Sequence, residues 1–173
     1  MKNVFNLIGL LFIISFLFYK FLYQAPKFND GEDLPNFEAQ LINGKSFELA
    51  ELKGNYVLLD FWGSWCGPCL RDNPNIVKLH QEFNGQKFKD AKGFEVVSVA
   101  IETSEKMCKG AILRDNLYWD YHIMLLDRFK SDIAQEFGVR EIPTKYLLSP
   151  DGKILSVNEP YDKMRERLQS KLN

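Results

Sequence analysis

Two of the chain's three cysteines stand close together, in the stretch WCGPC at residues 65–69. Only a glycine and a proline separate Cys66 from Cys69. This spacing serves three kinds of chemistry: a permanent disulfide, half of a metal site, or a thiol pair that repeatedly forms and breaks a bond. The residues around the pair must therefore distinguish among the three.

A metal site finds few further ligands in this chain. A structural zinc ion usually takes four cysteine or histidine ligands, often from two such pairs. The other candidates are Cys108, His80 and His122. His80 follows Cys69 by 11 residues, which is about 16 Å along a helix and too far for one metal. Haem attachment requires a histidine directly after the second cysteine, where this chain has Leu70. We therefore expect no metal and no bound cofactor.

A permanent disulfide would stabilise the fold only weakly, because closing so short a loop removes little entropy from the unfolded chain. The position of the pair favours a reactive role instead. An apolar run ends at Trp62, and a helix is expected to begin within the motif. Cys66 would then lie at a helix N-terminus, where unpaired amides and the helix dipole lower the pKa of a thiol. In such a pair the outer sulfur attacks and the inner sulfur of Cys69 resolves the mixed disulfide.

The elements that must position the pair follow from the hydrophobic pattern. Residues 56–62 (YVLLDFW) are nearly all apolar, as expected of a central strand covered on both faces. A helix over 68–83 should follow, kinked by Pro74. The other expected elements are a hairpin over 37–49 with an Asn-Gly turn, a strand over 94–101, a helix over 104–117, a strand over 122–126, a short helix over 132–137, a hairpin over 145–157 and a closing helix over 161–172.

Alternating strands and helices with a terminal hairpin predict an α/β sandwich, with helices on both faces of a mixed sheet. The 173 residues suffice for one well-formed core. Apolar residues make up 46% and charged residues 26% of the chain, and the formal net charge is −1. This balance is that of a globular protein, and nothing in it resembles a nucleic-acid-binding surface.

The N-terminus carries a separate signal. No charged residue occurs in residues 3–19, and a helix over residues 4–23 would rise about 30 Å, enough to cross a bilayer. A cleaved signal peptide is the rival interpretation, but Tyr23 occupies a position that should be small. A buried core helix is the third interpretation, and the absence of a cysteine after the apolar run excludes a lipoprotein anchor. We expect residues 1–23 to be a transmembrane anchor, 24–34 a tether and 35–173 the folded domain.

The active motif resembles that of a known family. Trp65-Cys66-Gly67-Pro68-Cys69 matches the WCGPC motif of thioredoxins, and the preceding VLLDFW matches as well. Ile142-Pro143-Thr144, preceded by Phe137-Gly138-Val139, resembles the cis-proline element of that family. The body also opens LPNFEAQLINGKSFELAELKGNY and later reads SPDGKI, which is similar to the membrane-anchored TlpA/ResA-like branch, related to the AhpC/TSA group. The resemblance covers about residues 34–172.

This resemblance implies a thioredoxin-like three-layer sandwich with an extra N-terminal hairpin. The 74 positions from Cys69 to Pro143 leave room for one inserted strand–helix unit of about 30 residues. In the site it implies, Cys66 is the nucleophile, Cys69 the resolving thiol and Pro143 the cis-proline beside the substrate. Asp60 corresponds to the buried acid that helps to deprotonate the resolving cysteine. The alternative is that Asp60 is a strand residue that faces solvent.

The resemblance also implies neighbours that contact substrate or tune the thiols. These are Trp65, Gly67, Pro68, Asp72, Ile142 and Thr144. Asp72 follows Cys69 by three residues, where related exported proteins often carry the longer glutamate; a charge that stabilises the helix dipole is the alternative. We expect Cys108 to be a buried apolar residue, and His80 and His122 to be structural or on the surface.

The function implied is that of an anchored thiol–disulfide oxidoreductase on the periplasmic side of the inner membrane. The positive charges that flank the apolar run leave its orientation nearly undecided, so the thiol–disulfide chemistry is what favours a domain outside the cytoplasm. Gly-Pro between the cysteines is similar to the reducing thioredoxins. The expected partners are protein disulfide substrates, with apocytochrome thiols before haem attachment as one candidate, and an upstream thiol electron donor. The alternatives are a thiol peroxidase of the AhpC/TSA type and a non-catalytic binding module with the same fold.

Overall fold

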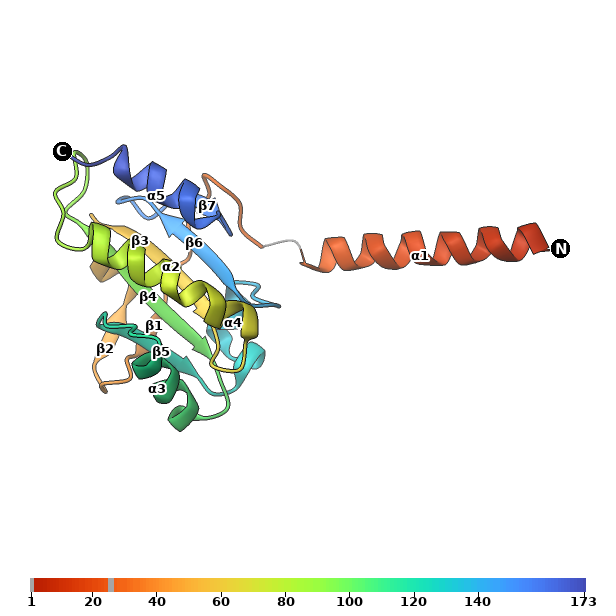
Figure 1. The fold of residues 1–173 in the computed structure, drawn as a ribbon, viewed down its shortest axis with the longest axis horizontal. Coiled ribbons are helices and arrows are strands. Elements are labelled where there is room, and N and C mark those ends of the chain that lie inside the picture. Colours follow the sequence, from red (N-terminus) through yellow and green to blue (C-terminus); the bar gives the residue numbers. More distant parts are fainter. Residues whose placement is uncertain (1, 25–26) are drawn as a thin grey trace.

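The structure, a computed structural model, describes residues 2–24 and 27–173. Within the latter range a five-stranded sheet has the order β5-β4-β3-β6-β7 (Figure 1). Its strands are β3 (Tyr56–Trp62), β4 (Phe94–Ile101), β5 (Tyr121–Leu125), β6 (Thr144–Leu148) and β7 (Ile154–Val157). Strands β3, β4 and β5 are parallel, whereas β6 and β7 are antiparallel to their neighbours. This is the mixed sheet that the sequence predicted.

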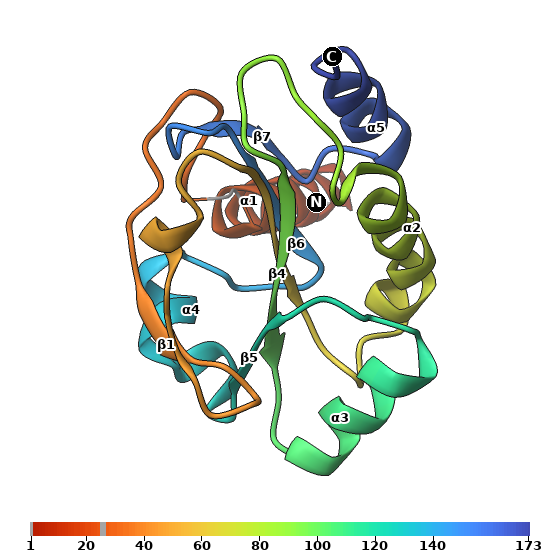
Figure 2. The same cartoon turned by 90° about the vertical axis from the view of Figure 1, so that its left-hand side faces the viewer.

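Helices lie on both faces of the sheet, as Figure 2 shows. One face is covered by α2 (Gly67–Phe83), α3 (Glu105–Arg114) and α5 (Tyr161–Gln169). The other carries α4 (Asp132–Glu136) and a separate hairpin of β1 (Glu38–Gln40) and β2 (Ser46–Glu48). Two short 3-10 turns, η1 (Leu49–Leu52) and η2 (Arg128–Lys130), complete the domain. The thioredoxin-like sandwich, its N-terminal hairpin and the inserted strand–helix unit, α3 with β5, are thus confirmed.

Strand β3 joins the two layers of the core. All seven of its residues are buried. Because side chains alternate between the faces of a strand, Leu58 and Trp62 enter the core cluster under α2, whereas Leu59 and Phe61 enter the cluster beneath the hairpin and α4. A nearly continuous apolar sequence was the correct signal for a strand covered on both sides.

Several element ends differ from the prediction by one to three residues, for identifiable reasons. Helix α3 begins at Glu105 because the hydroxyl of Ser104 accepts a hydrogen bond from the Met107 amide and caps the helix. It ends at Arg114 because Asn116, two residues on, has a positive φ of 58°. Helix α2 continues through Pro74 to Phe83.

The N-terminal part of the chain contains helix α1 (Lys2–Gln24). No helix among the residues whose side chains the structure describes is both long enough and apolar enough to span a membrane. Part of the predicted tether lies against the domain. The Gly31 amide donates to the Ile154 carbonyl at 2.7 Å and the Ile154 amide donates to Glu32 at 2.9 Å. The ring of Phe28 packs edge-on against that of Phe137, with centroids 6.2 Å apart.

Candidate active site

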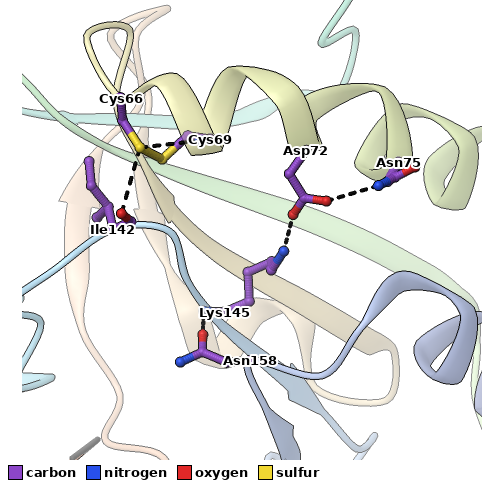
Figure 3. A network of polar contacts seen from close by, with 7 residues as sticks. All are labelled: Cys66, Cys69, Asp72, Asn75, Ile142, Lys145 and Asn158. Carbon is purple, nitrogen blue, oxygen red and sulfur yellow. Dashed lines mark hydrogen bonds and ion pairs between the residues drawn. A yellow bond between two sulfur atoms is a disulfide. The ribbon is translucent and has the colours of Figure 1, made fainter. Parts of the chain in front are cut away.

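The two cysteines lie where β3 ends and α2 begins. Cys66 is the N-cap residue of α2, and its sulfur accepts a hydrogen bond of 3.2 Å from the Cys69 amide. Pro68 stands in the first helical turn, where its missing amide hydrogen is not needed. The cysteines are joined as a disulfide with their Cα atoms 5.3 Å apart (Figure 3). The predicted placement of the pair at a helix N-terminus is therefore what the structure shows.

The exposure of the pair is small. Cys66 is 5% and Cys69 is 2% exposed, so both residues are buried in the oxidised state. Beside them Trp65 is 43% exposed. Its ring lies beneath the Arg128 guanidinium at 4.1 Å, and its indole N–H donates to the Ile101 carbonyl at 2.7 Å. The indole is thus held in one position directly beside the cysteine pair, with much of its surface exposed.

The Ile142–Pro143 loop faces Cys66. Its peptide bond is cis, and the Ile142 carbonyl oxygen lies 3.6 Å from the Cys66 sulfur (Figure 3). A disulfide sulfur has no hydrogen, so this is a contact in the oxidised state; the free thiol can donate to the same oxygen. Thr144 follows at the start of β6, and its hydroxyl donates to the Glu141 carbonyl at 2.8 Å. The sequence motif around Pro143 and the cysteine motif therefore meet in space.

Asp60 lies in the middle of β3 and is 2% exposed, so its strand position is buried and not solvent-facing. Its neighbours Leu58 and Trp62 belong to the cluster that contains both cysteines, and alternation places Asp60 on that same face. One carboxylate oxygen has no hydrogen-bond partner within the part of the chain that the structure describes. Burial raises the pKa of Asp60 to about 7, against a smaller opposing effect of the Lys145 charge.

Asp72 turns toward β6 and not toward the disulfide. Its carboxylate forms an ion pair with the Lys145 ammonium and accepts a hydrogen bond of 3.0 Å from the Asn75 side chain (Figure 3). Both partners of the ion pair are largely buried, with 24% of the Asp72 side chain and 11% of the Lys145 side chain exposed. Neither of the roles considered for Asp72 from the sequence included this partner.

Two charged residues near the site were missed by the sequence reasoning. Lys145 stands near the start of β6, and no pattern in the sequence indicated that its side chain faces α2. Glu102 directly follows β4 and is 1% exposed; its carboxylate accepts a hydrogen bond of 2.5 Å from the Ser64 amide in the loop before Cys66. A buried acid is stable only when such donors satisfy it, so Glu102 fastens the loop that carries Trp65.

The remaining cysteine and the histidines have packing contacts of their own. Cys108 lies on the buried face of α3, and burial raises its thiol pKa to about 12. His122 is stacked on Trp119, and burial lowers its pKa to about 4. His80 also packs against the Trp119 indole, with ring centroids 5.4 Å apart. Within the described ranges no group of three or more metal-binding side chains gathers.

The sequence is similar to those of known proteins over most of its length. Residues 31–157 match the AhpC/TSA family. The chain belongs to the AhpC/TSA family. Within it, the chain is 30% identical over 155 residues to the thiol-disulfide oxidoreductase ResA of Bacillus subtilis, an alignment that spans 87% of this chain and 79% of ResA. This AhpC/TSA protein is therefore a ResA-like thiol–disulfide oxidoreductase.

The fold of this AhpC/TSA protein is also similar to those of solved thiol–disulfide oxidoreductases. The thioredoxin domain of a thiol-disulfide oxidoreductase from Bacteroides vulgatus superimposes with a TM-score of 0.72 at 28% identity, over 85% of this chain and all of that domain. A thiol:disulfide interchange protein described as DsbE, from Chlorobium tepidum, gives a TM-score of 0.67 at 26% identity, over 83% of this chain and 97% of the other.

Proposed function

We propose that this oxidoreductase works as a reductase that transfers electrons from its Cys66–Cys69 dithiol to disulfides of exported proteins. The supporting observation is the Cys66 sulfur at the N-terminus of α2, 3.6 Å from the Ile142 carbonyl. A thiolate there is favoured by the helix dipole and by the Cys69 amide that already points at the sulfur.

The reaction balances within the pair. The Cys66 thiolate attacks a substrate disulfide, one substrate sulfur leaves as a thiolate that takes a proton from water, and a mixed disulfide remains. Cys69 then loses its proton to the Asp60 carboxylate and attacks the Cys66 sulfur. The second substrate sulfur leaves, and the dithiol becomes the Cys66–Cys69 disulfide as the substrate gains two electrons. An upstream thiol donor restores the dithiol, so no other cofactor takes part.

The neighbours of the cysteines have supporting roles in this proposal. Pro143 and Ile142 line the place where a substrate backbone would lie, and Thr144 holds the loop through its bond to Glu141. Trp65 covers the pair, while Gly67 and Pro68 set the first turn of α2. The small exposure of Cys66 restricts attack to disulfides in extended or unfolded segments that can reach past the indole.

We further propose that residues 1–23 anchor the protein in the inner membrane, with residues 24–34 as tether and 35–173 as domain on the periplasmic side. In support, α1 presents large apolar side chains to its surroundings, such as Phe12, which is 76% exposed, and Phe16, which is 64% exposed. Such a surface needs an apolar environment. Apocytochrome thiols before haem attachment are one substrate candidate at that location.

The test is reduction of a disulfide-bonded peptide by the full chain in detergent, with dithiothreitol as donor. The parent chain should accelerate the reaction, and Cys66→Ser should abolish the acceleration. Cys108→Ser is the matched control, because its side chain is fully buried on α3 and has no part in the proposed reaction, and it should keep the parent rate. An unchanged rate in Cys66→Ser would refute the proposal. Peroxide consumption by Cys69→Ser would instead support the peroxidase alternative.

A further inference from the structure

Three charged side chains meet between the active-site helix and the sheet. Asp60 on β3 and Lys145 on β6 are direct partners in the antiparallel ladder, so their Cβ atoms lie about 5 Å apart on the same face. That face packs against α2, where Asp72 stands one helical turn beyond Cys69. Lys145 is thus placed between one carboxylate of the sheet and one of the active-site helix.

The backbone of Lys145 is held by two hydrogen bonds to Asn158. Its amide donates to the Asn158 side-chain oxygen at 2.8 Å, and its carbonyl accepts from the Asn158 amide at 2.9 Å (Figure 3). Asn158 has a positive φ of 51°, a conformation that asparagine tolerates better than most residues. These hydrogen bonds fix the backbone from which the Lys145 side chain extends toward α2.

We propose that Lys145 is a positioning residue of the dithiol site, which holds Asp72 as a paired carboxylate and leaves Asp60 as the acid that exchanges a proton with Cys69. This inference rests on the proposed function and deepens it. The two acids differ in their surroundings. Asp72 has the ammonium and the Asn75 amide as partners, whereas one Asp60 oxygen is buried without a partner in the described structure.

Electrostatics support this division of roles. Lys145 from β6 and Asp72 from α2 are the charged groups that act on Asp60, the first lowering and the second raising its pKa. On β4 the residue opposite Asp60 is the uncharged Ser98. The net field at Asp60 therefore depends on how fully Asp72 neutralises the ammonium. Removing either member of the ion pair must shift the proton equilibrium of Asp60, and in opposite directions.

The step concerned is the resolution of the mixed disulfide. The Cys69 proton moves to Asp60, the Cys69 sulfur bonds to the Cys66 sulfur, and the bond from Cys66 to its adduct breaks, with the leaving group departing as a thiolate. Dithiobis-nitrobenzoate isolates this step. The reduced full chain in detergent releases one coloured thionitrobenzoate when Cys66 attacks and a second when Cys69 resolves the adduct.

The experiment records the rate of the second release against pH. In Lys145→Met the midpoint of the rising limb should shift upward by at least about half a unit, because a positive charge near Asp60 is lost. In Asp72→Asn it should shift downward by a similar amount, because the ammonium then faces Asp60 unpaired. Lys145→Arg, which retains the charge, should restore the parent profile. Lys78→Met, an exposed lysine on α2, is the matched control and should leave the midpoint unchanged.

The outcomes separate the inference from the function on which it depends. If the parent chain gives no second release, the proposed dithiol function is refuted and the role of Lys145 with it. If both releases occur but the Lys145→Met and Asp72→Asn midpoints stay at the parent value or shift in the same direction, the function stands and the inference is overturned. Should Lys145→Met fail to fold, Lys145→Gln and Asp72→Asn apply the same test.

Discussion

At the scale of single residues, the buried carboxylic acid of Asp60 makes the free energy of unfolding depend on pH. Asp60 is almost fully buried, and this burial raises its pKa to about 7 from an ordinary value of 3.8. Below about pH 4 the acid is protonated in both the folded and the unfolded chain. Between about pH 4 and pH 7 only the folded chain keeps the proton, so the free energy of unfolding falls as the pH rises through this window.

Asp60→Asn should therefore remove a pH dependence. The oxidised variant should unfold like the parent at pH 4 but be more stable at pH 8, by about 4 kcal/mol at most, since three pKa units correspond to roughly that energy. Urea unfolding at both pH values measures the difference. Equal stability of parent and variant at pH 8 would mean that Asp60 is not held protonated by the fold.

The same variant should slow resolution by Cys69 at pH 7, by about 100-fold or more.

The loop between β3 and α2 is the element whose geometry the site most depends on. Gly63 lies where an added Cβ would stand 2.9 Å from the Trp65 indole nitrogen, 3.1 Å from the Ile101 carbonyl and 3.1 Å from the Ile142 side chain. The backbone at the end of β3 therefore passes close to Trp65, to the end of β4 and to the cis-proline loop. A side chain at this position would separate the two halves of the site.

Gly63→Ala should consequently destabilise the protein by about 1–3 kcal/mol and reduce the reductase rate. Urea unfolding and the peptide-disulfide assay measure the two effects. Gly110→Ala is the matched control: a Cβ there meets nothing within 4 Å in the middle of α3, so it should stabilise by about 0.5–1 kcal/mol. A Gly63→Ala protein with parent stability and rate would show that the loop adapts freely.

At the same scale, the sequence predicted the elements better than their charged contacts. The apolar run YVLLDFW and the Gly-Pro motif were enough for β3, the start of α2 and the placement of Cys66, because these depend on local burial and capping. The partner of Asp72 depends instead on which β6 residue faces α2. That register is a property of the folded sheet, so Lys145 and Glu102 could be recognised only once the strands were paired.

At the scale of the whole molecule, the segment between the N-terminal helix and the predicted domain contacts the domain. Contacts of Phe28, Gly31 and Glu32 with the domain show that folding includes residues before the predicted boundary at residue 35. A composition rich in Pro, Gly and charge predicted a tether, but such residues can also follow a domain surface. The boundaries at residues 23 and 35 therefore stay predictions, which shortened chains can test.

Two truncations test this organisation. Without residues 1–26 the protein should move from the membrane to the soluble fraction and keep the stability and reductase rate of the domain. Without residues 1–34 it should lose the Gly31 and Glu32 hydrogen bonds to Ile154 and the Phe28 contact, and should unfold at lower urea concentration. Cell fractionation and urea unfolding measure these effects. Full-length protein found in the soluble fraction would contradict the anchor.

The most direct measurement of the central claim is the intact mass of Cys69→Ser after the reduced chain has met a disulfide-bonded peptide. If Cys66 is the attacking sulfur and Cys69 resolves, the variant should retain one half of the peptide, and fragmentation should place it on Cys66. The Cys66→Ser protein, treated in the same way, should carry no adduct. An unmodified Cys69→Ser chain, or a peptide attached to Cys108, would contradict the account.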